Sequence, residues 1–129
     1  MTSQHPETGI VYRFDDIEWM SPKTDGTQGP IEGVVGVDAY GRKLLAQGDG
    51  GFYTQVVQMP SGFEAPVHTH SHAEVFMVLD GDCTFNGQHM GQYDTTVVEA
   101  GEPYGFTAGA HGLRFLVVRS AKAGYAAVE

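Results

Sequence analysis

Hydrophobic residues in this chain fall into short runs rich in β-branched and aromatic side chains, and glycine-containing turns separate the runs. This pattern is typical of short β-strands joined by tight turns. No window of the chain shows a helical stripe of apolar positions bounded by capping residues. The pattern therefore predicts strands at residues 10–14, 31–37, 42–47, 52–59, 74–79, 83–85, 88–90, 95–99 and 113–119.

The segments between these runs carry turn signals. Asp80-Gly81-Asp82 is interpreted as one hairpin turn and Asn86-Gly87 as a second. Residues 15–30 are polar and rich in turn dipeptides, so we expect a long loop or arm there. The tail, residues 120–129, is expected to fray or to form a brief helix.

Many short strands with short connections, in a chain of 129 residues, predict a single all-β domain built as a sandwich or a barrel. A barrel of this size encloses side chains or one small ligand. Five apolar side chains are predicted to fill the core or line the pocket, without a catalytic role: Met59, Phe76, Val78, Phe106 and Phe115.

Charge and composition narrow the choice of partners. The formal net charge is −9 and the pI is near 4.9, and no basic patch supports binding to nucleic acid or to an anionic membrane. The single cysteine, Cys83, cannot form an internal disulfide, which fits a reducing compartment. The chain shows neither a secretory signal nor an apolar stretch of about 18 residues. The expected location is the cytoplasm.

The residues that carry chemistry lie between Gly62 and Gly81. His68 and His70 are two positions apart, so they face the same side of a strand. Glu74 opens the apolar run 75–79, and a cation would explain a carboxylate at that place, because an unpaired buried charge is costly. Two histidines and one carboxylate form a ligand set for a transition metal with open coordination positions.

The order Gly62-x5-His68-x-His70-x3-Glu74-x6-Gly81 resembles the first motif of the cupin superfamily at every fixed position. The resemblance covers about residues 45–120, which would form the barrel core, with residues 1–30 as an N-terminal strand and arm. It implies an all-β, cupin-type double-stranded β-helix, or jelly-roll barrel. It also implies a mononuclear metal site held by His68, His70 and Glu74.

The second cupin motif is only partly present. The chain has Gly91-Gln92 where the family commonly has Gly-Asp, and it has Ala108 at the place of an Asn. The frame Ala-Gly-x-Pro is kept in residues 100–103, and Tyr104 follows where the family usually supplies a third histidine ligand.

Three interpretations of Tyr104 stay open: a phenolate ligand, a residue that hydrogen-bonds a substrate or water beside the metal, or the mark of a weak or lost site. His72 also has two interpretations. It shares the parity of His68 and His70, so it is a possible substitute ligand; the family pattern places it in a turn.

The resemblance implies chemistry only broadly, since small cupins include dioxygenases, lyases, isomerases and polyketide-tailoring proteins. Our leading hypothesis is a dioxygenase-like enzyme that uses Fe(II) on a small keto- or hydroxy-bearing compound, aromatic or dicarbonyl. Glu74 and Tyr104 would be catalytic, with Tyr104 orienting the substrate or donating a proton. The alternatives are a lyase, isomerase or cyclase that uses Zn, Ni or Mn, and a non-catalytic small-molecule binder.

The apolar residues at 10–14, with Ile17, Trp19 and Met20, suggest an arm that crosses to a second copy of the chain. We therefore expect a homodimer.

Overall fold

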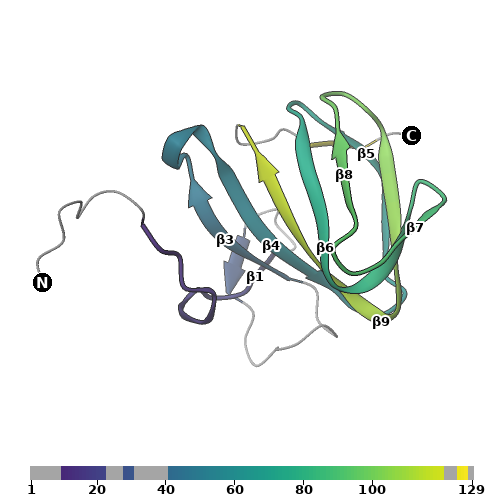
Figure 1. Cartoon of the computed structure of the whole chain (residues 1–129), viewed down its shortest axis with the longest axis horizontal. Helices are drawn as coiled ribbons and strands as arrows, with labels where there is room; N and C mark the ends of the chain where they lie inside the picture. The colour runs from purple at the N-terminus through teal and green to yellow at the C-terminus, as the bar shows by residue number, and fades with distance from the viewer. Residues whose placement is uncertain (1–9, 23–27, 31–40, 121–124, 128–129) are drawn as a thin grey trace, which may run out of the picture.

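The structure is a computed structural model that describes residues 10–22, 28–30, 41–120 and 125–127. Within these residues nearly all regular structure is strand, as Figure 1 shows, so the predicted all-β class is confirmed. The elements are η1 (Phe14–Asp16), β1 (Met20–Pro22), β2 (Gln28–Pro30), β3 (Gly41–Gln47), η2 (Asp49–Gly51), β4 (Tyr53–Met59), β5 (Glu64–His70), β6 (Glu74–Phe85), β7 (Gln88–Met90), β8 (Thr95–Val98), β9 (Tyr104–Arg119) and β10 (Tyr125–Ala127).

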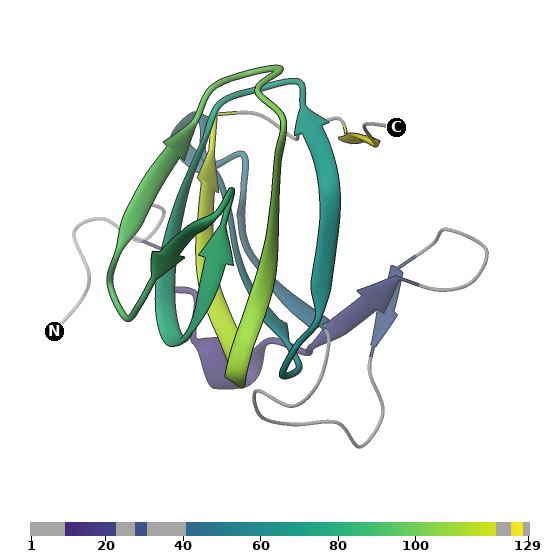
Figure 2. The ribbon, with the colours of Figure 1, turned by 90° about the vertical axis from the view of Figure 1, so that its right-hand side faces the viewer.

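Two long strands organise the barrel. β6 and β9 pair antiparallel along most of their length, from the pair Glu74↔Arg119 to the pair Phe85↔Phe106. The first part of β9 also pairs with β5 and the last part with β4, which joins the two sides of the barrel. One path of paired strands runs β10-β5-β9-β4-β3-β1-β2, and β7 and β8 pair with β6 (Figures 1 and 2).

Side chains at alternate positions of these strands fill the interior of the barrel. In β6 and β9 every second side chain is buried over long stretches, as expected for strands with one face on a core. Phe76 and Val78 have no exposed surface, and the Phe76 ring stacks on Phe115 with 4.3 Å between centroids. All five apolar residues that the sequence assigned to the core or pocket are buried: Met59, Phe76, Val78, Phe106 and Phe115.

The strand predicted at residues 10–14 is wrong, because residues 10–13 have no regular structure and Phe14 begins the 3-10 helix η1. Phe14 packs edge-on against Trp19, with ring centroids 5.6 Å apart. Lys43 donates a hydrogen bond from Nζ to the Phe14 carbonyl at 2.6 Å, and the same ammonium lies 3.9 Å from the centre of the Phe14 ring. Burial lowers the pKa of Lys43. These tertiary contacts override the local β propensity of the segment.

The arm and the tail also differ from expectation. Residues 15–30, predicted as a loop, contain the paired strands β1 and β2. The tail contains the strand β10, which pairs with β5, where a brief helix or fraying was expected. The strand predicted at 31–37 lies outside the described residues. No helix in the described part of the chain is long and apolar enough to cross a membrane.

The Asn86-Gly87 prediction is confirmed, since these residues join β6 to β7 with positive φ angles of 45° and 81°. Gly81 is different: β6 continues through it, and the register with β9 shifts on both sides. Gly81 has φ of +74°, and a Cβ at this position would collide with the carbonyl group of Gly112. The glycine therefore marks an irregularity where two strands bend together rather than a hairpin turn.

We expect the Gly81→Ala variant to be less stable than Gly51→Ala. Both glycines have positive φ, so an alanine costs about 1 kcal/mol at either position for its conformation. At Gly81 the new methyl group would also collide with backbone, and overpacking adds about 1–3 kcal/mol. At Gly51 nothing lies within 4 Å of the added carbon. Urea unfolding of both variants measures the difference, and equal stabilities would contradict the close approach of β6 and β9.

Cys83 provides a check on the packing of the core. Its side chain is 1% exposed, and burial raises the pKa of its thiol to about 11. Because the thiolate is the reactive form, we expect the folded protein at pH 8 to react with a disulfide reagent far more slowly than the protein in urea. A thiol with a raised pKa also lowers stability as the pH rises from about 9 towards 11. Reaction at the same rate with and without urea would show that Cys83 is not buried.

Candidate functional site

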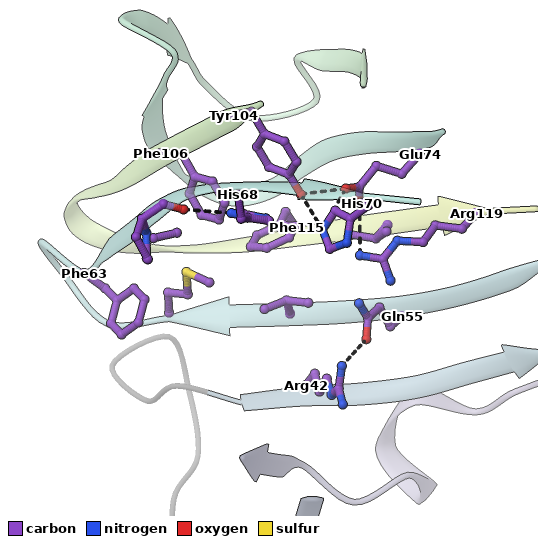
Figure 3. Close-up of a pocket in the computed structure, with 15 residues that line it drawn as sticks. Arg42, Gln55, Phe63, His68, His70, Glu74, Tyr104, Phe106, Phe115 and Arg119 are labelled. Atoms are coloured by element: carbon purple, nitrogen blue, oxygen red, sulfur yellow. Dashed lines mark hydrogen bonds and ion pairs between the residues drawn. The ribbon is translucent and has the colours of Figure 1, made fainter. Parts of the chain in front are cut away.

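A pocket of about 210 Å³ lies inside the barrel, and its lining has an apolar part and a polar part (Figure 3). The apolar part is formed by Val57, Met59, Phe63, Ala65, Pro66, Phe106, Phe115 and Val117. The polar part is formed by Arg42, Gln55, His68, His70, Glu74, Tyr104 and Arg119. A cavity of this volume is smaller than the 300–1,000 Å³ typical of sites for drug-sized ligands, so it fits a small molecule.

Strand pairing brings the four predicted site residues together. His68 and His70 lie on one face of β5, and His68 is paired in register with Tyr104, the first residue of β9. Glu74 is the first residue of β6, four positions after His70, the last residue of β5, and residues 71–73 form the short turn between the two strands. All four side chains line the same pocket, although they come from three strands.

Glu74 is the centre of a hydrogen-bonded cluster. Its carboxylate is 1% exposed, and the Tyr104 hydroxyl donates to Oε1 at 2.6 Å. His70 Nε2 lies 3.1 Å from the Tyr104 oxygen and 3.4 Å from Glu74 Oε1. Because the single hydroxyl proton goes to Glu74, the Tyr104 oxygen accepts the bond from His70, and His70 Nε2 carries the proton in this arrangement.

His68 has the hydrogen bond that is usual for a metal ligand. Its Nδ1 lies 2.8 Å from the Pro66 carbonyl oxygen, and a carbonyl can only accept, so Nδ1 carries the proton. The lone pair of the ring is then on Nε2. Metal-ligating histidines commonly donate their other ring N–H to a backbone carbonyl in this way.

Arg119 neutralises the buried carboxylate from the other side. It is the last residue of β9 and pairs in register with Glu74. Its Nη2 lies 3.3 Å from Glu74 Oε2, and its side chain is 15% exposed. Glu74 is therefore bound through both oxygens, one by a phenol and one by a guanidinium, which offsets the cost of burying its charge.

The donor types at this site fit a transition metal, since imidazole and carboxylate suit iron, zinc, nickel and manganese, and His68 is in the ligand form. In the structure these side chains bind one another through hydrogen bonds. Among the described residues, no three His, Cys, Asp or Glu side chains are placed as ligands around one point. A metal held at His70 Nε2 would require the other tautomer of this ring, with the proton on Nδ1.

The structure places His72 in the turn between β5 and β6. Its side chain is exposed, its Nδ1 lies 2.9 Å from the Ser71 hydroxyl, and it is not part of the pocket lining. The substitute-ligand interpretation of His72 is therefore not supported by its position.

Three polar residues that line the pocket were not predicted from the sequence: Arg42, Gln55 and Arg119. Side-chain alternation was the available signal. Arg119 has the parity of the buried Phe115 and Val117, and Gln55 has the parity of Met59, so strand periodicity places both on the inner face. Arg42 had no comparable signal, because it lies near the start of a short strand of mixed burial.

No protein-family model and no curated protein sequence matches this chain. Solved structures do match it. One is an RmlC-like cupin from Shewanella frigidimarina, which is 16% identical and has a TM-score of 0.63 over 84% of this chain and 86% of its own. The chain has the cupin fold. The fold implied by the residues from Gly62 to Gly81 is thus confirmed.

Two other similar structures show how widely the cupin fold is used. KdgF from Halomonas sp. is 16% identical, with a TM-score of 0.67 over 89% of this chain and 96% of its own. The polyketide cyclase RemF from Streptomyces resistomycificus is 20% identical, with a TM-score of 0.66 over 93% of this chain and 87% of its own. Further cupin structures include a lyase and a candidate dioxygenase. At these identities the likeness shows the fold alone.

Proposed function

We propose that this cupin is a metal-dependent enzyme in which His68, His70 and Glu74 hold one divalent transition metal. The observation that carries the proposal is the gathering of these three side chains, with Tyr104, in one pocket. The hydrogen bond from His68 Nδ1 to the Pro66 carbonyl supports it, because it leaves Nε2 as the ligand nitrogen.

Fe(II) is the metal we favour, and a two-histidine, one-carboxylate iron supplies oxidation of a bound oxygen-bearing substrate by O₂. The substrate would be a small keto- or hydroxy-bearing compound, aromatic or dicarbonyl. Phe63, Phe106 and Phe115 would pack against its apolar body. The Tyr104 hydroxyl would orient its oxygen atoms, and the walls of the small cavity would keep bulk water away.

A second candidate is a cupin without a redox reaction. The Arg119–Glu74 ion pair favours its non-catalytic form, because a guanidinium already neutralises the carboxylate that would bind a metal. Such a protein would be a lyase, isomerase or cyclase that uses zinc, nickel or manganese, or a binder without catalysis.

The test is O₂ uptake by purified protein reconstituted with Fe(II) under anaerobic conditions and then mixed with aerated β-diketones or aromatic hydroxy ketones. We expect substrate-dependent uptake that the double variant His68→Ala, His70→Ala loses. His89→Ala is the matched control, since His89 is an exposed histidine bound to Asp82 outside the pocket.

Turnover of the same compounds by the zinc or nickel form without O₂ would select the non-redox candidate. Absence of turnover with every metal, together with unchanged ligand binding in Glu74→Gln, would select the binder.

A further inference from the structure

Glu74 is the only carboxylate among the described residues that line the pocket. In the structure its negative charge is paired with the Arg119 guanidinium, whose Nη2 lies 3.3 Å from Oε2. In the proposed function the same negative charge binds a divalent metal. The carboxylate is 1% exposed, so water does little to screen one cation from the other. The guanidinium and the metal therefore depend on one and the same negative charge.

The two oxygens of the Glu74 carboxylate have different neighbours. Oε1 lies 3.4 Å from His70 Nε2 and accepts the hydrogen bond of the Tyr104 hydroxyl, so it is the oxygen that faces the predicted ligands. Oε2 faces Arg119, on the other side of the carboxylate (Figure 3). A metal bound at Oε1 would thus share this carboxylate with a guanidinium at Oε2.

Strand pairing keeps Arg119 beside this carboxylate. Arg119 is the last residue of β9, and it pairs in register with Glu74, the first residue of β6. Its Nε is buried and has no hydrogen-bond partner among the described residues, and Nη2 donates to Glu74. Because the register of two long strands fixes both backbones, the Arg119 side chain starts next to Glu74 whether or not a metal is bound.

We propose that Arg119 is the internal counter-ion of Glu74 and that it lowers the affinity of the site for a divalent metal. A guanidinium draws negative charge away from the carboxylate and repels a second cation. A hydrogen bond to a ligating carboxylate can also orient it and so favour metal binding. Repulsion is the larger effect here, because like charges in a poorly solvated pocket repel by more than one hydrogen bond contributes.

Arg119 would then act in opposite directions on two properties of the chain. It stabilises the metal-free fold, because it compensates the buried charge of Glu74. It weakens the metal-bound form, because the metal must bind a carboxylate that is already neutralised. This inference rests on the proposed function, since it concerns the same metal.

The test is the zinc affinity of Arg119→Gln, because zinc has no redox chemistry that would disturb a titration. Protein treated with EDTA and desalted would compete with a chromophoric chelator for zinc, and the double variant His68→Ala, His70→Ala would give the background from surface histidines. We expect Arg119→Gln to bind zinc at least about tenfold more tightly than the wild type, a ratio that corresponds to about 1.4 kcal/mol. Equal or weaker binding would overturn the proposal.

Three further variants separate the charge of Arg119 from its shape. Arg119→Lys keeps the positive charge but loses the forked donors, so it should bind zinc nearly as weakly as the wild type. Arg119→Met removes the charge from an unbranched side chain, and it takes the place of Arg119→Gln if that variant does not fold. Arg13→Gln is the control for net charge, because Arg13 is exposed and outside the pocket lining, and it should leave zinc affinity unchanged. Equally tight binding by Arg119→Lys and Arg119→Gln would overturn the role of the charge.

Urea unfolding gives a second measurement, which a purely structural role of Arg119 would not reproduce. Without metal, Arg119→Gln should be less stable than the wild type, because Glu74 loses its partner. Added zinc should raise the unfolding midpoint of Arg119→Gln more than that of the wild type, because the tighter ligand adds more stability. A variant that is both less stable and weaker in zinc binding would show that Arg119 only supports the fold.

The same titrations separate this inference from the proposed function. Zinc binding by the wild type that is as tight as in Arg119→Gln would reject only the inference. Zinc binding by Arg119→Gln but not by the wild type would support the inference and reject the metal-dependent enzyme. Absence of zinc from both proteins would reject both.

Discussion

The Glu74→Leu variant is expected to lose about 3 kcal/mol of unfolding free energy when it is measured after EDTA treatment. Breaking a buried ion pair from one side leaves the partner charge without compensation, at a typical cost of about 3–5 kcal/mol. We expect the lower end, because the Arg119 side chain keeps 15% of its surface in water. The Tyr104 hydroxyl would also lose its acceptor at 2.6 Å.

Three further variants separate the charge from the hydrogen bond: Glu74→Gln, Arg119→Leu and the double variant Glu74→Leu, Arg119→Leu. Glu74→Gln keeps an acceptor for Tyr104 and should lose less stability than Glu74→Leu. In the double variant Glu74→Leu, Arg119→Leu, neither charge is left alone, so the loss should be smaller than the sum of the two single losses. Urea unfolding of the wild type, Glu74→Leu, Arg119→Leu and the double variant gives the coupling free energy between the two side chains. Additive losses, or a change below about 0.5 kcal/mol in Glu74→Leu, would show that the Glu74–Arg119 pair is not formed.

The second large effect is expected in Phe76→Ala, which should lose about 3–5 kcal/mol. The Phe76 side chain is fully buried, and its ring contacts the rings of Phe85, Phe106 and Phe115 at centroid distances of 5.1, 5.3 and 4.3 Å. Removing it leaves a cavity that these rings cannot fill without leaving their positions. Phe106 and Phe115 also line the pocket, so weaker ligand binding should accompany the loss.

Phe52→Ala is the control for that experiment, since Phe52 is 55% exposed and should cost less than about 1 kcal/mol. Thermal or urea unfolding measures both variants. Similar losses for the two phenylalanines would mean that the stacked rings around Phe76 do not form the core of the barrel.

The sequence singled out four residues that the structure gathers in one pocket, because their signals are local. His68 and His70 lie on the same face because they are two positions apart on a strand. Glu74 stands out as a charged residue directly before an apolar run. The position of Tyr104 followed from the Ala-Gly-x-Pro frame before it. The structure brings all four into one pocket, and their roles as ligands or catalytic groups stay predictions.

The errors arose where distant contacts decide the local structure. Asp-Gly is a hairpin signal in sequence, and the contact with Gly112 that makes Gly81 a bend within β6 is 31 positions away. The 10–14 segment has strand propensity, but the contact of Phe14 with Lys43 draws it onto the barrel. The pairing of Arg119 with Glu74 likewise depends on the register of β6 and β9, which no local pattern encodes.

The homodimer and the cytoplasmic location stay predictions. The dimer is testable by sedimentation of the full chain, and the apolar arm residues Ile17 and Trp19 are the first to replace if it forms.

The most direct test of the central claim is the metal content of the protein. The full chain would be loaded separately with Fe(II) under anaerobic conditions, zinc, nickel and manganese, desalted, and measured by elemental analysis beside the double variant His68→Ala, His70→Ala and the control His89→Ala. We expect about one ion per chain in the wild type and the control and almost none in the double variant. A wild type that retains no metal after any loading, or a double variant that retains as much as the wild type, would contradict the metal site at His68, His70 and Glu74.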